Sequence, residues 1–144
     1  QDNFDANVYI EKIQRVINDY EKLESNITFN IETNTDAKSL EPVIFSALSA
    51  SRLQVLTQKE DLNTHLTITI KSDIKKANSY GFILARSAIS IVVKDYKGTI
   101  IGSNKLNIIG QSTHGYSDAK ENVTVKLNKM LLQDGIEKVI GLSL

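Results

Sequence analysis

The spacing of apolar side chains predicts a helix near the amino-terminal end. Between Ala6 and Leu23, apolar residues recur three or four positions apart, and neither Gly nor Pro interrupts them. This spacing gathers them on one face of a helix, while Glu11 and Arg15 form an i, i+4 pair on the polar face. The stripe consists of Tyr9, Ile13, Val16, Tyr20 and Leu23, widened by Ile10 and Ile17. We therefore expect an amphipathic helix over residues 6–23.

The same period predicts two further helices. Ser39 is placed to cap the first of them, which tolerates Pro42 in its first turn and ends near Ser51. Its buried face comprises Leu40, Val43, Ile44, Ala47 and Leu48. The second begins at Tyr116 or Ser117 and runs to Gly135, with Ala119, Val123, Leu127, Met130 and Leu131 inward. The last nine residues add another turn around Val139 and Ile140.

Alternation of apolar and polar residues predicts three strands, and a segment rich in apolar and β-branched residues, followed by a turn, predicts two more. They cover residues 27–31, 53–57, 66–70, 83–94 and 99–109. The fourth and fifth are joined by Asp95-Tyr96-Lys97-Gly98, a turn in which the glycine supplies the positive φ, so they form a hairpin. The strand at residues 66–70 has one polar face, which is typical of an antiparallel strand that meets water on one side.

The predicted order is α-β-α-β-β-β-β-α, which indicates an α+β fold. The simplest architecture is a single mixed β-sheet, in which a β-α-β unit is followed by an antiparallel meander. Its helices pack on one face, and we expect the first and last of them to lie side by side. No linker divides the sequence, so residues 1–144 are expected to form one domain.

Composition and charge exclude several classes of function. The chain of 144 residues has 17 basic and 17 acidic side chains, so it lacks the net positive charge of a general nucleic-acid binder. It has no Cys and only two His, which argues against a thiol nucleophile and against a metal site. No apolar stretch is long enough to span a bilayer. We expect no catalytic residue, no cofactor and no metal.

The segment Gly110–Gly115 is the most conspicuous candidate for a catalytic or binding site. A serine hydrolase that uses this loop would need the G-x-S-x-G spacing, but here the second glycine follows Ser112 by three residues. The segment is better interpreted as a loop that leads the hairpin into the final helix. A weaker alternative is that backbone N–H groups of residues 112–117 bind a small anion at the helix start.

Two other candidate sites are better explained by structural roles. His65 begins a strand, and nearby Glu60 and Asp61 do not complete a metal site, so we treat it as structural. A basic cluster, in which Tyr80 and Phe82 lie between charged residues, is interpreted as a solvated strand edge rather than a binding site for single-stranded nucleic acid. Its basic members are Lys71, Lys75, Lys76 and Arg86.

Two stretches resemble a group of bacterial cell-envelope domains. Residues 40–48 followed by 52–56 resemble the helix and strand that these domains place after their first strand, and residues 88–101 resemble their strand, D-x-x-G turn and strand. Gly110 and residues 117–132 resemble their final helix. The group includes the curli-secretion lipoprotein, the amino-terminal domain of the Tol-Pal translocation protein B, lipoprotein activators of penicillin-binding proteins, and flagellar T-ring proteins.

The resemblance implies a non-catalytic protein of the bacterial periplasm or outer membrane, made with a signal peptide. Such a domain docks onto another envelope protein or assembles with copies of itself, without nucleic acid, and a lipid anchor would lie outside these residues. The expected contact surface is the hairpin turn together with the loop before the last helix. Its residues are Lys94, Tyr96, Lys97, Ser112, His114 and Tyr116.

Two rival classes remain open at this point. A small-ligand or anion-binding domain, or an enzyme, would need a pocket with convergent polar groups beside Ser112 and His114. A nucleic-acid module is suggested by a general similarity to anticodon-binding domains. Retention of oligonucleotides at low ionic strength would support that second class.

Overall fold

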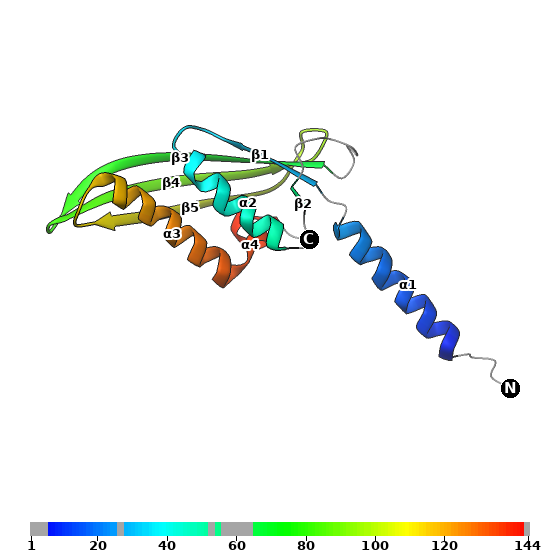
Figure 1. Cartoon of the computed structure of the whole chain (residues 1–144). Helices are drawn as coiled ribbons and strands as arrows, with labels where there is room; N and C mark the ends of the chain where they lie inside the picture. Colours follow the sequence, from blue (N-terminus) through cyan, green and yellow to red (C-terminus); the bar gives the residue numbers. More distant parts are fainter. Residues whose placement is uncertain (1–5, 26–27, 52–53, 56–64, 143–144) are drawn as a thin grey trace.

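The computed structural model describes residues 6–25, 28–51, 54–55 and 65–142, and Figure 1 shows their course. The elements follow the order α1 (Ala6–Ser25), β1 (Thr28–Thr33), η1 (Lys38–Leu40), α2 (Glu41–Ala50), β2 (Gln54–Val55), β3 (His65–Ser79), β4 (Phe82–Lys94), β5 (Ile100–Ser112), α3 (Tyr116–Asp134) and α4 (Ile136–Ile140). The predicted order of helices and strands is confirmed. The 3-10 turn η1 is an addition, and α4 is the extra turn expected at the end. Ile27, Leu53 and Thr57, which were assigned to strands, lie outside the described residues.

The strands form one mixed sheet in the order β2-β1-β3-β4-β5. β1 pairs in parallel with both β2 and β3, whereas β3 with β4 and β4 with β5 are antiparallel. This confirms the β-α-β unit followed by an antiparallel meander. The expectation for residues 66–70 was incomplete, because this part of β3 pairs in parallel with β1 on one side and antiparallel with β4 on the other.

Two strands are longer than the sequence predicts. β3 continues nine residues past Ile70 to Ser79 and turns at Tyr80 and Gly81, both of which have positive φ. Beyond Ile74 its side chains lose the apolar alternation, because most of them are exposed. β5 includes Gly110 and Ser112, so the predicted loop is reduced to residues 113–115.

The start of α2 differs from the prediction. Ser39 does not cap the helix: it lies inside η1, Leu40 holds the cap position, and no side chain caps the helix there. The preceding turn is instead held by Asn34, whose Oδ1 accepts a hydrogen bond from the Ala37 N–H at 3.0 Å. Pro42 lies in the first turn, as predicted.

The core lies between the sheet and the helices α2, α3 and α4, which cover one face. This arrangement follows from the alternating apolar positions of the strands, because one side of each strand is apolar. Its largest fully buried side chains are Phe29, Leu40, Ile44, Leu48, Ile68, Ile70, Ile91, Val93, Val123, Leu127 and Ile140. We refer to the sheet with these three helices as the body.

α1 does not lie where the sequence predicts. It leads away from the body beyond the amino-terminal end of β1, and α2 rather than α1 is the neighbour of α3 (Figure 1). The large apolar side chains described in α1, namely Val8, Tyr9, Ile10 and Ile13, are between 43% and 60% exposed. The prediction that the first and last helices pack side by side is therefore wrong, because α2, α3 and α4 already fill that face of the sheet.

Candidate interaction surface

The turn between β4 and β5 presents three of the predicted surface residues on a well-fixed loop. Asp95 Oδ1 accepts hydrogen bonds from the N–H groups of Lys97 and Thr99, each at 2.9 Å. Gly98 has a φ of +85° and donates its N–H to the Asp95 carbonyl. Within this frame Lys97 Nζ lies 5.6 Å from the centre of the Tyr96 ring. Tyr96 is 45% exposed, and Lys94 and Lys97 are exposed too, so an aromatic ring and two cations face outward together.

The other three predicted residues lie where β5 meets α3. Ser112 Oγ accepts a hydrogen bond from the His114 N–H at 3.0 Å, and His114 Nδ1 lies 3.3 Å from Thr113 Oγ1. Among the described residues, no hydrogen bond joins Ser112 Oγ to the imidazole. The serine and histidine are thus neighbours through the backbone only. This geometry gives no support to a hydrolase that uses residues 110–115.

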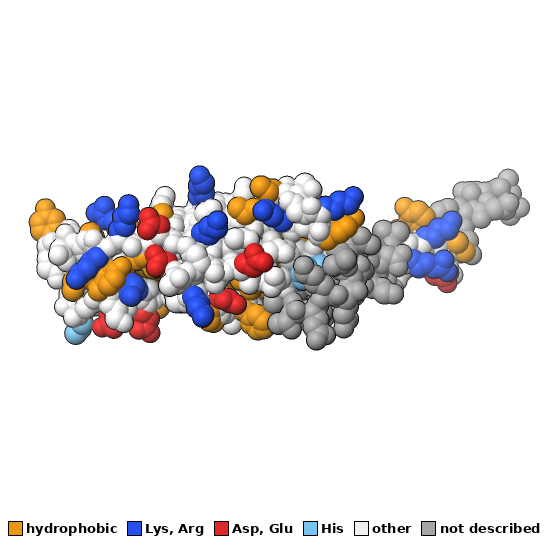
Figure 2. Space-filling view, turned by 90° about the horizontal axis from the view of Figure 1, so that it is seen from above, with side chains coloured by type: hydrophobic (Ala, Val, Ile, Leu, Met, Phe, Trp, Pro, Cys, Tyr) orange, Lys and Arg blue, Asp and Glu red, His pale blue; other side chains and the backbone are white. Residues whose placement is uncertain are grey.

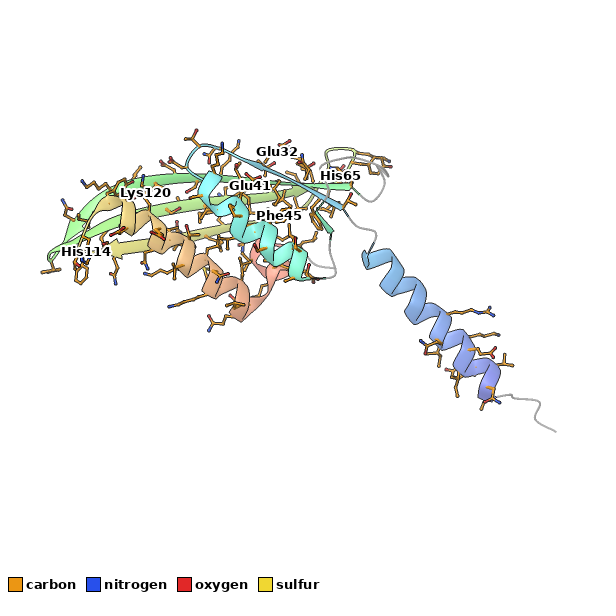
Figure 3. All side chains as sticks on the ribbon, viewed as in Figure 1. Glu32, Glu41, Phe45, His65, His114 and Lys120 are labelled. Atoms are coloured by element: carbon orange, nitrogen blue, oxygen red, sulfur yellow. The ribbon has the colours of Figure 1, made fainter. Side chains whose placement is uncertain are left out.

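The two groups lie at opposite ends of the β4–β5 hairpin. Lys94 pairs with Ile100 at one end, and Ile83 pairs with Ser112 at the other. Eleven residues of extended strand separate Ile83 from Lys94, a distance of roughly 37 Å. Figure 3 shows His114 at the far end of the body from His65. The six residues that were predicted to form one contact surface therefore form two separate surfaces.

Tyr116 is held between two lysines. Its ring lies 4.9 Å from Lys120 Nζ, one helical turn further along α3, and 5.7 Å from Lys76 Nζ on β3. Such distances allow cation–π attraction of roughly 0.5–1 kcal/mol at an exposed site. Lys120 was not predicted from the sequence, although its i, i+4 spacing from Tyr116 is a usable signal. Lys76, predicted on a solvated strand edge, lies instead against this ring.

A shallow hollow of about 410 Å³ adjoins this cluster, between the loop before α2 and the start of α3. It is lined by Thr35, Asp36, Ser39, Ile74, Ser117, Lys120, Glu121 and Thr124. Carboxylates and one ammonium share its wall, so it is not a strongly positive anion site. Ser112 and His114 do not line it.

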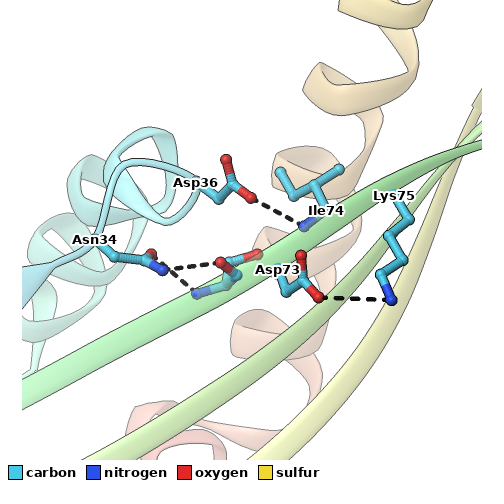
Figure 4. Close-up of polar contacts among 6 residues, drawn as sticks. Asn34, Asp36, Asp73, Ile74 and Lys75 are labelled. Carbon is cyan, nitrogen blue, oxygen red and sulfur yellow. Dashed lines mark hydrogen bonds and ion pairs between the residues drawn. The ribbon is translucent and has the colours of Figure 1, made fainter.

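Asn34 and Asp36 cover part of the outer edge of β3, where β1 no longer pairs with it. Figure 4 shows Asn34 exchanging hydrogen bonds with the Ser72 backbone, where Oδ1 accepts the N–H at 3.0 Å and Nδ2 donates to the carbonyl at 2.9 Å. Asp36 Oδ2 accepts the next outward N–H, that of Ile74. These side chains imitate a neighbouring strand and shield the edge from unwanted pairing. From the sequence this segment was predicted only as a polar loop.

The basic cluster of the sequence analysis is divided between two faces of the sheet. Lys71, Lys75 and Arg86 are exposed on the face that carries no helix, whereas Lys76 contacts Tyr116. Asp73 lies 3.9 Å from Lys75 and offsets part of the charge. On the face seen in Figure 2, Lys and Arg side chains are spread among Asp and Glu along the body. This distribution does not favour a nucleic-acid surface.

The described residues contain no cluster of His, Asp and Glu that could hold a metal ion. His65 is 2% exposed, and its Nδ1 lies 2.9 Å from Thr28 Oγ1 on the neighbouring strand. Glu60 and Asp61 lie outside the described residues. No helix within the described ranges is long and apolar enough to cross a bilayer.

Several solved structures are similar to this chain at low sequence identity. A minor lipoprotein from Acinetobacter baumannii is 11% identical, with a TM-score of 0.60 over 81% of this chain and 96% of that one. PelC from Paraburkholderia phytofirmans, a dodecamer, is 12% identical, with a TM-score of 0.50 over 78% of this chain and 86% of that one. Lipoprotein GNA1162 from Neisseria meningitidis is 8% identical, with a TM-score of 0.47 over 75% and 99% of the two chains.

No protein-family model matches the sequence, and no curated protein is similar to it. The fold is thus one that a bacterial lipoprotein also adopts. A specific relationship to the curli-secretion or Tol-Pal proteins remains a prediction from the sequence.

Proposed function

We propose that this chain is a non-catalytic domain of the bacterial cell envelope that assembles with copies of itself. The observation that carries the proposal is the row of exposed apolar side chains on α1. An exposed apolar stripe on a helix costs free energy in water, so it is typical of a surface that a partner covers. Nothing among residues 6–15 contributes to the core of the body.

The fold supports an envelope location. The minor lipoprotein from Acinetobacter baumannii matches over almost its whole length. Periplasmic or outer-membrane association, with a lipid anchor outside the present sequence, is consistent with that likeness. The likeness concerns the fold, and the location itself is part of the proposal.

Self-association is favoured over docking to a different protein. PelC, which shares the fold at a TM-score of 0.50, forms a dodecamer. The body here also presents Tyr96 beside Lys97 on a rigid turn, and exposed aromatic residues are enriched in contact surfaces. The turn is thus a second surface, separate from α1, at which another envelope protein could dock.

Crosslinking of the full-length protein in its native cells tests the proposal. The expected result is a crosslinked species made of copies of this chain, a dimer at the least, with any second envelope protein lost when Tyr96→Ala and Lys97→Ala are combined. Tyr80→Ala at the opposite turn is the matched control, because Tyr80 is fully exposed and equally aromatic. Capture of cytoplasmic proteins, or no crosslinked species in either form, would reject the envelope-assembly function.

Binding of a small anion is a second candidate, and Lys76, Tyr116 and Lys120 are the observation that favours it. Asp36 and Glu121 in the adjoining hollow act against it. Titration with inorganic phosphate, followed by backbone amide shifts, tests this candidate. Saturable shifts at residues 116–120 that vanish in Lys120→Gln would support it, whereas uniform small shifts would dismiss it.

A further inference from the structure

α1 carries an apolar face that the body does not cover. Most helical stability in proteins comes from packing of such a face rather than from the helix alone. In the structure Val8, Tyr9, Ile10 and Ile13 are exposed, and α1 leads away from the body (Figure 1). The helix therefore needs a partner surface of its own length.

The sequence of α1 repeats with the period of paired helices. From Tyr9 to Leu23 the stripe residues are spaced by four, three, four and three positions, a heptad pattern. Ile13 and Tyr20 take position a, and Tyr9, Val16 and Leu23 take position d. The flanking positions e are Ile10, Ile17 and Glu24, and the flanking positions g are Lys12 and Asp19. The a and d seam, widened by Ile10 and Ile17, is an apolar face that a second helix can cover.

The flanking charges distinguish the two possible directions of pairing. In a parallel pair, position g faces the e position of the next heptad, so Asp19 would face Glu24 of the second copy, a like-charge contact made twice. In an antiparallel pair, g faces g and e faces e. Lys12 of each copy then faces Asp19 of the other, so an opposite-charge contact is made twice. On the opposite flank Ile10 faces Ile17, and the contact of Asp19 with Glu24 is absent.

We propose that two copies of this chain pair through α1 in an antiparallel, two-fold symmetric arrangement. Position 13 of each helix lies opposite position 16 of the other, which makes the contact isologous and self-limiting. The two bodies then lie at opposite ends of a helix pair about 30 Å long. The proposal deepens the assembly function proposed above and rests on it.

Charge reversal provides the first test. We expect Lys12→Glu, and separately Asp19→Lys, to weaken dimerisation about tenfold, because each creates two like-charge contacts. The double variant Lys12→Glu with Asp19→Lys should restore it to within about threefold of the original. Glu11→Lys is the matched control, because Glu11 occupies the outward f position and should change little. Sedimentation equilibrium over a range of protein concentrations gives the dissociation constants.

Direction is tested separately with introduced cysteines, since the natural sequence has none. In the antiparallel register, position 6 lies opposite position 23. A mixture of the Ala6→Cys and Leu23→Cys variants should therefore form the mixed disulfide under mild oxidation, with little disulfide between two copies of the Ala6→Cys variant. Preferential linkage of two Ala6→Cys copies would indicate parallel helices and overturn the proposal.

Two further outcomes separate this proposal from the proposed function. If multimers persist in Ile13→Asp, and if the double charge reversal does not restore dimerisation, helix pairing is overturned while envelope assembly still stands. A full chain that stays monomeric at every concentration would also overturn it. Loss of the dimer in Ile13→Asp with rescue by the double charge reversal is the result that supports it. The body should stay folded in the variants at positions 6, 11, 12 and 13, because none of these positions belongs to its core.

Discussion

Gly110 of β5 lies directly against the backbone carbonyl of Ala119 in α3. A Cβ atom on Gly110 would overlap that oxygen and would also lie 2.8 Å from Val123 Cγ2 and 2.9 Å from Val123 N. The glycine is thus required for close approach of helix and strand rather than for an unusual φ. This contact joins α3 to the sheet beside the second of the two candidate surfaces.

Gly110→Ala should therefore destabilise the body. Because the obstructing atoms belong to the backbone, the helix must shift, at a cost of about 2 kcal/mol or more. Urea unfolding monitored by circular dichroism measures the loss. Gly115→Ala is the matched control, since nothing lies within 4 Å of its Cβ position and its φ of −179° suits any residue. Equal stability of the two variants would contradict the proposed close contact.

Ser72 and Ser87 form a buried polar pair on the helix-covered side of the sheet. Their hydroxyls lie 2.7 Å apart on neighbouring strands, and both residues are less than 5% exposed. Removing one hydroxyl leaves the other buried with no partner in the pair, so Ser87→Ala should cost about 1–2 kcal/mol. The double change Ser72→Ala with Ser87→Ala should cost less than the sum of the single changes. A double-mutant cycle in urea measures the coupling, and strict additivity would show that the pair contributes nothing.

The sequence carried most of the information about the fold. Alternation and helical spacing predicted every strand and helix of the body, because each buries one apolar face against the others. The extensions of β3 beyond Ile74 and of β5 through Gly110 could not be read in this way. There the strands are held by pairing and by a glycine contact, and their side chains carry no apolar alternation.

The candidate site was less predictable, because it depends on which residues the topology brings together. Tyr96 and Tyr116 were both singled out from sequence, but hairpin register places them at opposite ends of β4 and β5. The contact of Lys76 with Tyr116 joins residues that are 40 positions apart and left no local signal. The position of α1 was mispredicted for a related reason. Its pattern shows that a face must be buried, but not which surface buries it.

Asn34 should be important for the edge of β3. Asn34→Ala removes its hydrogen bonds to Ser72 and Ala37, and a loss of about 1–2 kcal/mol follows from the groups left unsatisfied. Hydrogen exchange should accelerate at the Ser72 amide, which then faces solvent. Asn78→Ala, further along the same strand and exposed, serves as the control. Unchanged exchange at Ser72 would mean that Asn34 does not protect this edge.

Stability of the body should be independent of the apolar stripe on α1. Ile13 and Ile91 carry the same side chain, but Ile13 is 43% exposed on α1 whereas Ile91 is 1% exposed within the core. Ile91→Ala should cost about 2–5 kcal/mol through lost burial and the cavity that remains, while Ile13→Ala should change the free energy of unfolding by less than about 0.5 kcal/mol. Urea unfolding at low protein concentration makes the comparison, because dimerisation would otherwise add to the apparent stability. A large loss in Ile13→Ala under those conditions would mean that α1 packs against its own body, as the sequence first suggested, and would leave no exposed stripe for a second copy to cover.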